Sequence, residues 1–170
     1  MRVFIAVLFD EKVKKVLCKA ISDLKSQAVS GNFTREENLH LTLAFIGETN
    51  RITALKNVID STAPKRFSLA IKGFGRFGRQ SGGIYWVGVE KNIKLMEYAS
   101  KLADALRLSG FNIENREFKP HITIGREVIT ENEIELDVPK TIMTVKRISL
   151  MKSERIQGVL TYTEIYGKDI

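Results

Sequence analysis

Two short segments of this chain are near copies of each other, and together they contain its only two histidines. One reads LHLTLAF (residues 39–45) and the other reads PHITIGR (residues 120–126). In both, apolar residues alternate with polar ones, which is typical of a β-strand with one buried face. The alternation predicts two strands in which the histidine and the threonine of each segment point to the same side, away from the core.

Within each predicted strand the imidazole and the hydroxyl are two residues apart, so their Cα atoms lie about 6.5–7 Å apart. This spacing suits groups that contact different atoms of one small ligand, such as the oxygens around a phosphorus. In-line displacement at phosphorus needs one group that removes a proton and one that donates a proton, and imidazole titrates near neutral pH. His40 and His121 are therefore the candidate catalytic residues. Thr42 and Thr123 are candidates to hydrogen-bond the non-bridging oxygens.

Simpler interpretations of the histidines stay open at this point. A single histidine is often structural or merely exposed, and two short strings can match by chance, although the matching flanks favour one shared site. A zinc site is less favoured, because two histidines outside a spaced ligand motif such as HExxH are too few to close one. The sequence therefore predicts no metal and no other cofactor.

The rest of the chain predicts a mixture of helices and strands. Asp10 is a plausible N-cap for the first helix, which residues 30–32 end, and residues 75–83 form a loop rich in glycine and arginine. Strands are expected at about 2–9, 39–47, 67–74, 84–90, 120–126, 141–151 and 159–166, and helices at about 10–28, 53–61 and 92–109.

Each histidine segment follows a strand and a long helix, which predicts two lobes built on one plan and related by an approximate two-fold axis. No linker composition separates them, so residues 1–170 are expected to form one domain. The apolar N-terminal run is too short for a membrane span and is interpreted as a strand rather than a signal peptide. A single cysteine, Cys18, excludes an internal disulfide framework and indicates a reducing cytoplasm.

The net charge of +7 favours an anionic partner such as RNA. Many basic proteins bind nothing acidic, however, and surfaces rich in lysine and glutamate also accompany thermostability. Charge alone therefore leaves the partner open.

The sequence resembles the 2H phosphoesterases, a family named for two His-x-Thr/Ser motifs, and within it the RNA 2′,3′-cyclic phosphodiesterases, also called 2′–5′ RNA ligase-like proteins. The resemblance covers nearly the whole chain. Four segments carry it: RVFIAV (residues 2–7), NLHLTLAFIG (38–47), FKPHITIGR (118–126) and ISLMKS (148–153).

The resemblance implies a bilobal α+β fold with antiparallel sheets flanked by helices and a central active-site cleft in which the histidines face each other. It also implies hydrolysis of a 2′,3′-cyclic phosphate to a 2′-phosphomonoester without a metal. His121 is then expected to activate water, and His40 to protonate the departing 3′ oxygen. The reverse assignment is chemically equivalent by symmetry.

Several other side chains are candidates to bind the substrate. Arg126 occupies the place in the second motif that Phe45 occupies in the first, but strict alternation puts Arg126 on the face opposite His121 unless the strand bends near Gly125. Rings that can stack on an RNA base belong to Phe77, Tyr85, Trp86 and Phe118, and cations that can meet phosphates of a longer strand belong to Arg76 and Arg79.

Other functions stay open beside the hydrolysis of cyclic phosphate ends. The same site would suit 2′–5′ ligation, cleavage of 2′–5′ linkages, or a cyclic phosphate of ADP-ribose. A non-catalytic RNA-binding module is also compatible with the charge, although binding alone does not need two titratable groups. The expected partner is an RNA or nucleotide with a 2′,3′-cyclic phosphate, with no membrane involved, and the expected state is a monomer.

Overall fold

Two antiparallel sheets and three helices make up the structure, a computed structural model that describes residues 1–79 and 81–170. The expected α+β class with antiparallel sheets is confirmed. The elements in chain order are β1 (Arg2–Val7), α1 (Glu11–Gln27), β2 (Ser30–Phe33), a 3₁₀ turn (Glu36–Asn38), β3 (Leu41–Glu48), α2 (Ile52–Thr62), β4 (Phe67–Phe77), β5 (Ser81–Val89), α3 (Ile93–Leu108), β6 (His121–Ile129), β7 (Thr141–Val145), β8 (Arg147–Ile156) and β9 (Val159–Asp169).

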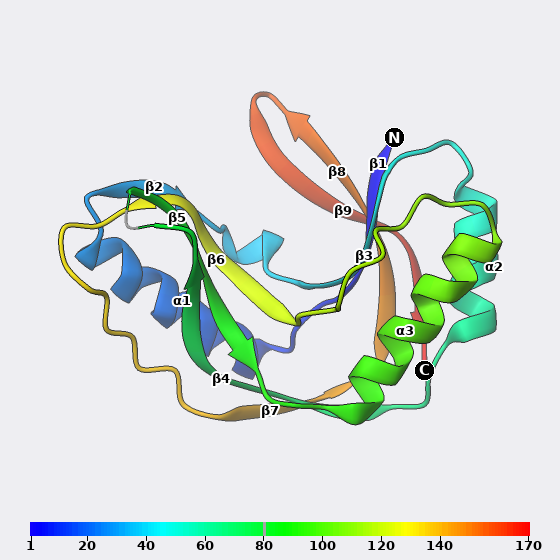
Figure 1. The fold of residues 1–170 in the computed structure, drawn as a ribbon, viewed down its shortest axis with the longest axis horizontal. Coiled ribbons are helices and arrows are strands. Elements are labelled where there is room, and N and C mark those ends of the chain that lie inside the picture. Colours follow the sequence, from blue (N-terminus) through cyan, green and yellow to red (C-terminus); the bar gives the residue numbers. More distant parts are fainter. Residues whose placement is uncertain (80) are drawn as a thin grey trace.

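The strand order places one histidine segment in each sheet (Figure 1). The first sheet has the order β3-β1-β8-β9, and the second has the order β2-β6-β5-β4-β7. His40 directly precedes β3 in the first sheet, and His121 begins β6 in the second. The two motifs therefore reach the site from different sheets.

The two long helices begin at side-chain caps. The Asp10 carboxylate accepts a hydrogen bond from the backbone nitrogen of Val13 at 2.9 Å, which starts α1. The Asn92 side chain accepts one from Leu95 at 3.0 Å, which starts α3. Each helix then buries one apolar stripe, which in α1 contains Val13, Leu17, Ala20 and Leu24.

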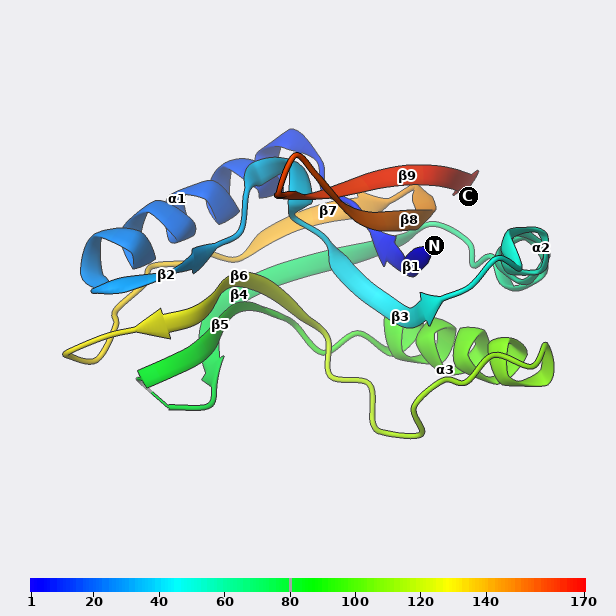
Figure 2. The same ribbon diagram turned by 90° about the horizontal axis from the view of Figure 1, so that it is seen from above.

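Helices α1 and α3 each pack on a sheet other than the one that contains the strand before them. Helix α1 follows β1 of the first sheet but packs on the second, where it contacts β2, β6 and β7. Helix α3 follows β5 of the second sheet but packs with α2 against β3 of the first, and it also contacts β4 of the second. Figures 1 and 2 show α1 at one end of the molecule and both α2 and α3 at the other. One hydrophobic cluster runs through both lobes and includes Ile5, Leu150, Val87 and Ile124.

Three expectations about the elements were wrong. Residues 30–33 form β2, which pairs with β6 although its sequence, SGNF, has a weak strand pattern, because the neighbouring strand supplies the backbone partners. The run 141–151 divides at Lys146, since β7 pairs with β4 in the second sheet and β8 with β1 in the first. Much of the expected loop 75–83 belongs to the β4–β5 hairpin, and Gln80 lies outside the described residues.

Within the described residues, no helix is long and apolar enough to cross a membrane.

Candidate active site

His40 lies between the 3₁₀ turn and β3 and is hydrogen-bonded through both ring nitrogens. Its Nδ1 atom is 2.7 Å from the carbonyl oxygen of Asn38, and its Nε2 atom is 3.0 Å from Oγ1 of Thr42. A carbonyl oxygen only accepts hydrogen bonds, so Nδ1 carries a hydrogen in both the neutral and the charged ring. Nε2 is therefore the nitrogen that gains and loses a proton, and it lies beside the threonine of its own motif.

His121, the first residue of β6, is oriented in the same way. Its Nδ1 atom is 2.7 Å from the carbonyl oxygen of Lys119. In both motifs the carbonyl that orients the ring belongs to the residue two positions before the histidine. Nε2 of His121 is thus the nitrogen that takes no part in this hydrogen bond, so each motif offers one ring nitrogen for proton transfer.

Two aromatic rings pack against each histidine. The His40 ring lies 4.7 Å from Phe4 and 5.2 Å from Tyr162, measured between ring centroids. The His121 ring lies 5.2 Å from Phe77 and 6.5 Å from Trp86. These rings limit the directions that each imidazole can take and reduce its contact with water.

A β-bulge interrupts the alternation of β3 three residues after His40. In the pairing with β1, Ala6 faces Thr42 and Ile5 faces Ala44, so Leu43 has no partner. Leu43 and Ala44 are consequently both buried, although they are consecutive residues of a strand.

A bulge occupies the same place in β6. In the pairing with β5, Trp86 faces Thr123 and Tyr85 faces Gly125, so Ile124 has no partner. Ile124 and Gly125 are again both buried, as the equivalent pair is in β3.

The bulges bring the fifth residue after each histidine back to the histidine's own face. Strict alternation does not hold in β6, because the unpaired Ile124 shifts the phase of the strand by one residue. This is a departure next to Gly125 of the kind that Arg126 needs in order to share a face with His121. In β3 the same shift places Phe45 opposite Phe4, whose ring packs on His40. Arg126 is exposed, and half of the Phe45 surface is exposed, so both side chains are accessible.

The charges of the second motif act on His40. Burial lowers the pKa of His40 because it penalises the charged ring, while the hydrogen bond to the Asn38 carbonyl opposes this effect. The positive charges of Arg126 and His121 lower the pKa of His40 further. The two motifs are therefore within electrostatic reach of each other, which agrees with the contact between β3 and β6.

The two threonines differ in their surroundings. Both are half-buried, but only the hydroxyl of Thr42 has a hydrogen bond to its histidine among the contacts of the described residues. Thr123 is tied through its backbone instead, since its carbonyl accepts a hydrogen bond from Oγ1 of Thr34 at 3.0 Å. This bond joins the chain segment that leads to His40 directly to β6.

The remaining candidates are spread over several environments. Phe45 lies under the guanidinium of Arg2, at 5.0 Å from the ring centroid, and Phe118 is half-buried against the main hydrophobic cluster. Phe77 and Trp86 pack on His121.

Tyr85 is only 3% exposed and lies on the opposite face of its strand from Trp86, so the structure does not place it for stacking on a ligand. The exposed Arg76 lies near the end of β4, and the exposed Arg79 lies in the connection between β4 and β5.

Three residues beside His40 escaped the sequence analysis: Phe4, Asn38 and Tyr162. Phe4 comes from β1, which pairs with β3, and Tyr162 comes from β9, two strands further along the sheet. No local pattern in the sequence reveals this strand order. Asn38 stands two residues before the histidine, and its polar side chain next to an apolar run was the one signal that could have identified it.

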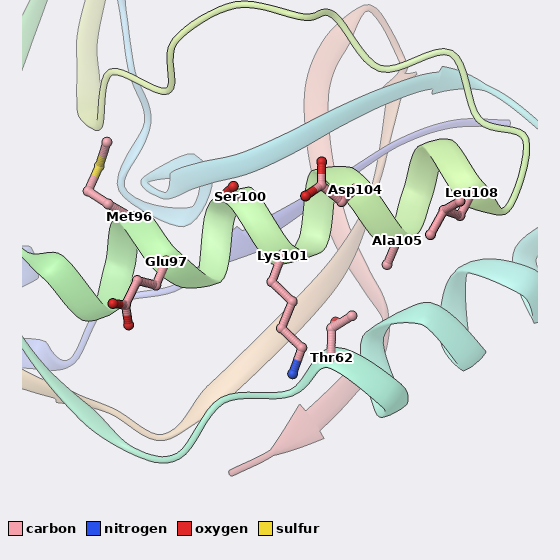
Figure 3. Close-up of a pocket in the computed structure, with 8 residues that line it drawn as sticks. All are labelled: Thr62, Met96, Glu97, Ser100, Lys101, Asp104, Ala105 and Leu108. Carbon is pink, nitrogen blue, oxygen red and sulfur yellow. The ribbon is translucent and has the colours of Figure 1, made fainter.

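The pocket beside α3 does not contain either histidine. It is lined by residues such as Thr62, Ser100 and Leu108 (Figure 3). Among the described residues, no cluster of three or more His, Cys, Asp or Glu side chains is placed to hold a metal ion.

Comparison with known proteins places this arrangement in a family. Residues 13–157 match the model of the 2′-5′ RNA ligase superfamily. The chain is 34% identical over 164 residues to a Thermotoga maritima protein named RNA 2′,3′-cyclic phosphodiesterase, covering 90% of this chain and 87% of the relative. It is 29% identical to a protein of the same name from Methanothermobacter thermautotrophicus, covering 97% of this chain and 96% of the relative.

The fold matches a solved structure over the same length. The crystal structure of Escherichia coli LigT complexed with 3′-AMP has a TM-score of 0.85 and 25% identity to this chain, and the match covers 99% of this chain and 97% of the other.

Proposed function

The chain belongs to the 2′-5′ RNA ligase superfamily, and we propose that it hydrolyses RNA 2′,3′-cyclic phosphate ends to 2′-phosphomonoesters. One observation carries the proposal: two histidines from different sheets each keep Nδ1 on a backbone carbonyl and leave Nε2 to exchange a proton. The names of the relatives from Thermotoga maritima and Methanothermobacter thermautotrophicus support the same substrate.

The proposed reaction is an in-line displacement at phosphorus. One Nε2 removes a proton from water as the water oxygen bonds to phosphorus. The other Nε2 donates its proton to the 3′ oxygen as the bond between phosphorus and that oxygen breaks. The product has a free 3′ hydroxyl and a 2′-phosphate, and the two rings have exchanged protonation states.

We propose that His121 is the base and His40 the acid. The lowered pKa of His40 leaves this ring mostly neutral in the free protein at neutral pH. A bound phosphate anion opposes the repulsion by Arg126, so substrate binding raises the pKa of His40 and favours the protonated ring that the acid role needs.

The other groups of the site would hold the phosphate and the base. We assign Thr42 and Thr123 to the non-bridging oxygens and Arg126 to the negative charge, which its return to the His121 face supports. Phe45 and Phe118 are assigned to the nucleotide, Phe45 on the grounds of its exposed ring. Since imidazoles supply both proton transfers and Arg126 supplies a positive charge, the proposed reaction needs no metal.

Both histidines of the site come from one chain, so we propose that the protein acts as a monomer. A cytoplasmic location fits the single cysteine.

The test is incubation of the protein with an RNA oligonucleotide ending in a 2′,3′-cyclic phosphate, in the presence of EDTA, with separation of the 2′- and 3′-phosphate products. We expect the 2′-phosphate, and we expect it to disappear in His40→Ala and His121→Ala. A 3′-phosphate product, or a reaction abolished by EDTA, contradicts the proposed mechanism. RNA binding without turnover would instead favour a non-catalytic module.

The superfamily name leaves 2′-5′ ligation as a second candidate. In ligation a 5′ hydroxyl takes the place of water. Its oxygen bonds to phosphorus as one histidine removes its proton, and the bond to the 3′ oxygen breaks as the other histidine donates a proton, which gives a 2′-5′ phosphodiester. Adding a 5′-hydroxyl oligonucleotide and ADP-ribose cyclic phosphate to the same assay ranks the three substrates by kcat/KM.

A further inference from the structure

Asn38 joins the turn before His40 to the edge of the first sheet. Its Nδ2 atom donates to the carbonyl oxygen of Leu160 at 3.0 Å, and its Oδ1 atom accepts from the backbone nitrogen of Tyr162 at 3.3 Å. Both partners belong to β9, the edge strand, so the side-chain amide occupies the place that a further strand would take. The residue is only 6% exposed, which protects these bonds from water.

The same residue also orients the imidazole of His40. The Asn38 carbonyl is the group that keeps the hydrogen on Nδ1, at 2.7 Å. The backbone nitrogen of Asn38 donates to the carbonyl of Arg35 at 2.9 Å, so the residue is fixed at its nitrogen, its side chain and its carbonyl together. A carbonyl held in this way has one direction in which to accept a hydrogen bond.

In the second motif, the carbonyl that orients the histidine is fixed in a different way. Lys119, whose carbonyl orients His121, is exposed and precedes Pro120. A residue before proline is restricted to extended backbone, which limits the direction of its carbonyl without any contact to another strand. Of the two carbonyls that orient the histidines, only that of Asn38 belongs to a residue whose side chain is hydrogen-bonded to a distant strand among the described contacts.

We infer that Asn38 is a positioning residue, which couples the tautomer and the direction of His40 to the β8–β9 hairpin. The hairpin extends away from the body of the molecule in Figure 1, and its only ring beside His40 among the described contacts is that of Tyr162, at 5.2 Å. The hairpin therefore acts on the imidazole by two routes, ring packing and the Asn38 amide. The inference rests on the proposed function for its kinetic consequence alone.

The first readout needs no substrate. At a pH where both histidines are neutral, the ¹⁵N chemical shifts of each ring show which nitrogen carries the hydrogen, and His121→Gln assigns the signals of His40. We expect the hydrogen on Nδ1 of His40 in the unchanged protein. In Asn38→Ala we expect a large part of the population to carry it on Nε2, the tautomer that cannot accept a proton there.

Asn92→Ala is the matched control. The Asn92 amide also joins two backbone groups, donating to the carbonyl of Ser68 at 2.6 Å and accepting from Leu95 at 3.0 Å. Its removal destabilises the fold without any contact to a histidine. We expect the His40 tautomer to stay unchanged in this variant, which separates positioning from general loss of stability.

The second readout is kinetic. In Asn38→Ala we expect kcat for the cyclic phosphate to fall about tenfold or more, with a much smaller change in KM, because a misdirected proton donor affects the transition state more than binding. In Asn92→Ala, kcat per folded molecule should be unchanged. If the unchanged protein has no activity, the proposed function fails while the tautomer result still decides the role of Asn38.

A second variant covers the case in which Asn38→Ala does not fold. Asn38→Asp has nearly the same shape, keeps one acceptor for Tyr162 and puts a carboxylate oxygen against the Leu160 carbonyl, so it breaks the donor half of the tie. A shift of the His40 tautomer in this variant supports the inference. Retention of the Nδ1 hydrogen in each of these variants that folds, with an unchanged kcat, overturns it.

Discussion

Leu43 and Ile124 occupy equivalent places in the two halves of the molecule, because each is the third residue after a histidine and each lacks a partner in its sheet. The pair of bulges determines which later side chains face the same side as the histidines. Without them, Phe45 and Arg126 would both point to the core, where an arginine has no compensating charge. The bulges therefore have a structural role, because they set the face to which Phe45 and Arg126 point.

The first prediction concerns the two histidines. His40→Ala and His121→Ala should each lower kcat for an RNA cyclic phosphate by about 10²–10⁴-fold, because each removes one proton-transfer step. Steady-state kinetics measure the loss, and circular dichroism checks that both variants fold. Full activity in both single variants would rule out the proposed acid–base pair.

Arg126→Gln should lower kcat/KM by about 10–100-fold, the effect of losing a hydrogen bond to a charged group. It should also raise the pKa of His40, since it removes one of the positive charges that lower it. With His40 as the acid, kcat/KM falls as pH rises through this pKa, so the alkaline limb of the profile should move to higher pH.

The pH profile of Arg126→Gln also discriminates between the two role assignments. Movement of the acidic limb instead of the alkaline limb would reverse the roles of His40 and His121. An unmoved profile would contradict the electrostatic coupling between the motifs.

Replacing each threonine with valine tests the phosphate contacts. Thr42→Val and Thr123→Val should each reduce kcat/KM by about 10–100-fold through a lost hydrogen bond to the charged phosphate. The loss should be larger for Thr42→Val, because its hydroxyl also contacts Nε2 of His40 at 3.0 Å. Equal losses in the two variants would mean that this contact contributes nothing to the reaction.

The stability of the free protein should depend on pH through His40. Its pKa in the folded protein is below the ordinary value of 6.5, so the unfolded state binds the proton more readily. The neutral His40 ring therefore contributes to the free energy of unfolding. This contribution is fully present above the pKa of the unfolded state and is lost as the pH falls through the pKa of the folded state. Urea unfolding of the unchanged protein and of His40→Gln across this pH range measures the contribution of His40. If the free energy of unfolding changes with pH equally in both proteins, His40 contributes nothing.

The sequence carried enough information for most of the strands, the long helices and the likeness of the two motifs, because each depends on local periodicity and capping. It did not reveal β2 or the division of residues 141–151, which depend on partner strands. Alternation in residues 39–43 and 120–124 correctly placed each histidine with its threonine. It failed one residue later, since a bulge depends on the neighbouring strand. The contacts between Asn38 and β9 could not be predicted for the same reason, because the residues that they join are more than a hundred positions apart in the chain.

The exchange of helices between the lobes has a consequence for how such a chain is assembled. Residues 1–62 supply β1 and β3 to the first sheet but β2 and α1 to the second, so neither half contains a complete lobe. A fragment that ends after α2 would keep β2 beside α1 but would lack β6 and β7, which also cover its apolar stripe. Each half therefore needs the other in order to fold. If the chain is cleaved between α2 and β4 and the two fragments are separated, they should regain structure only when they are mixed.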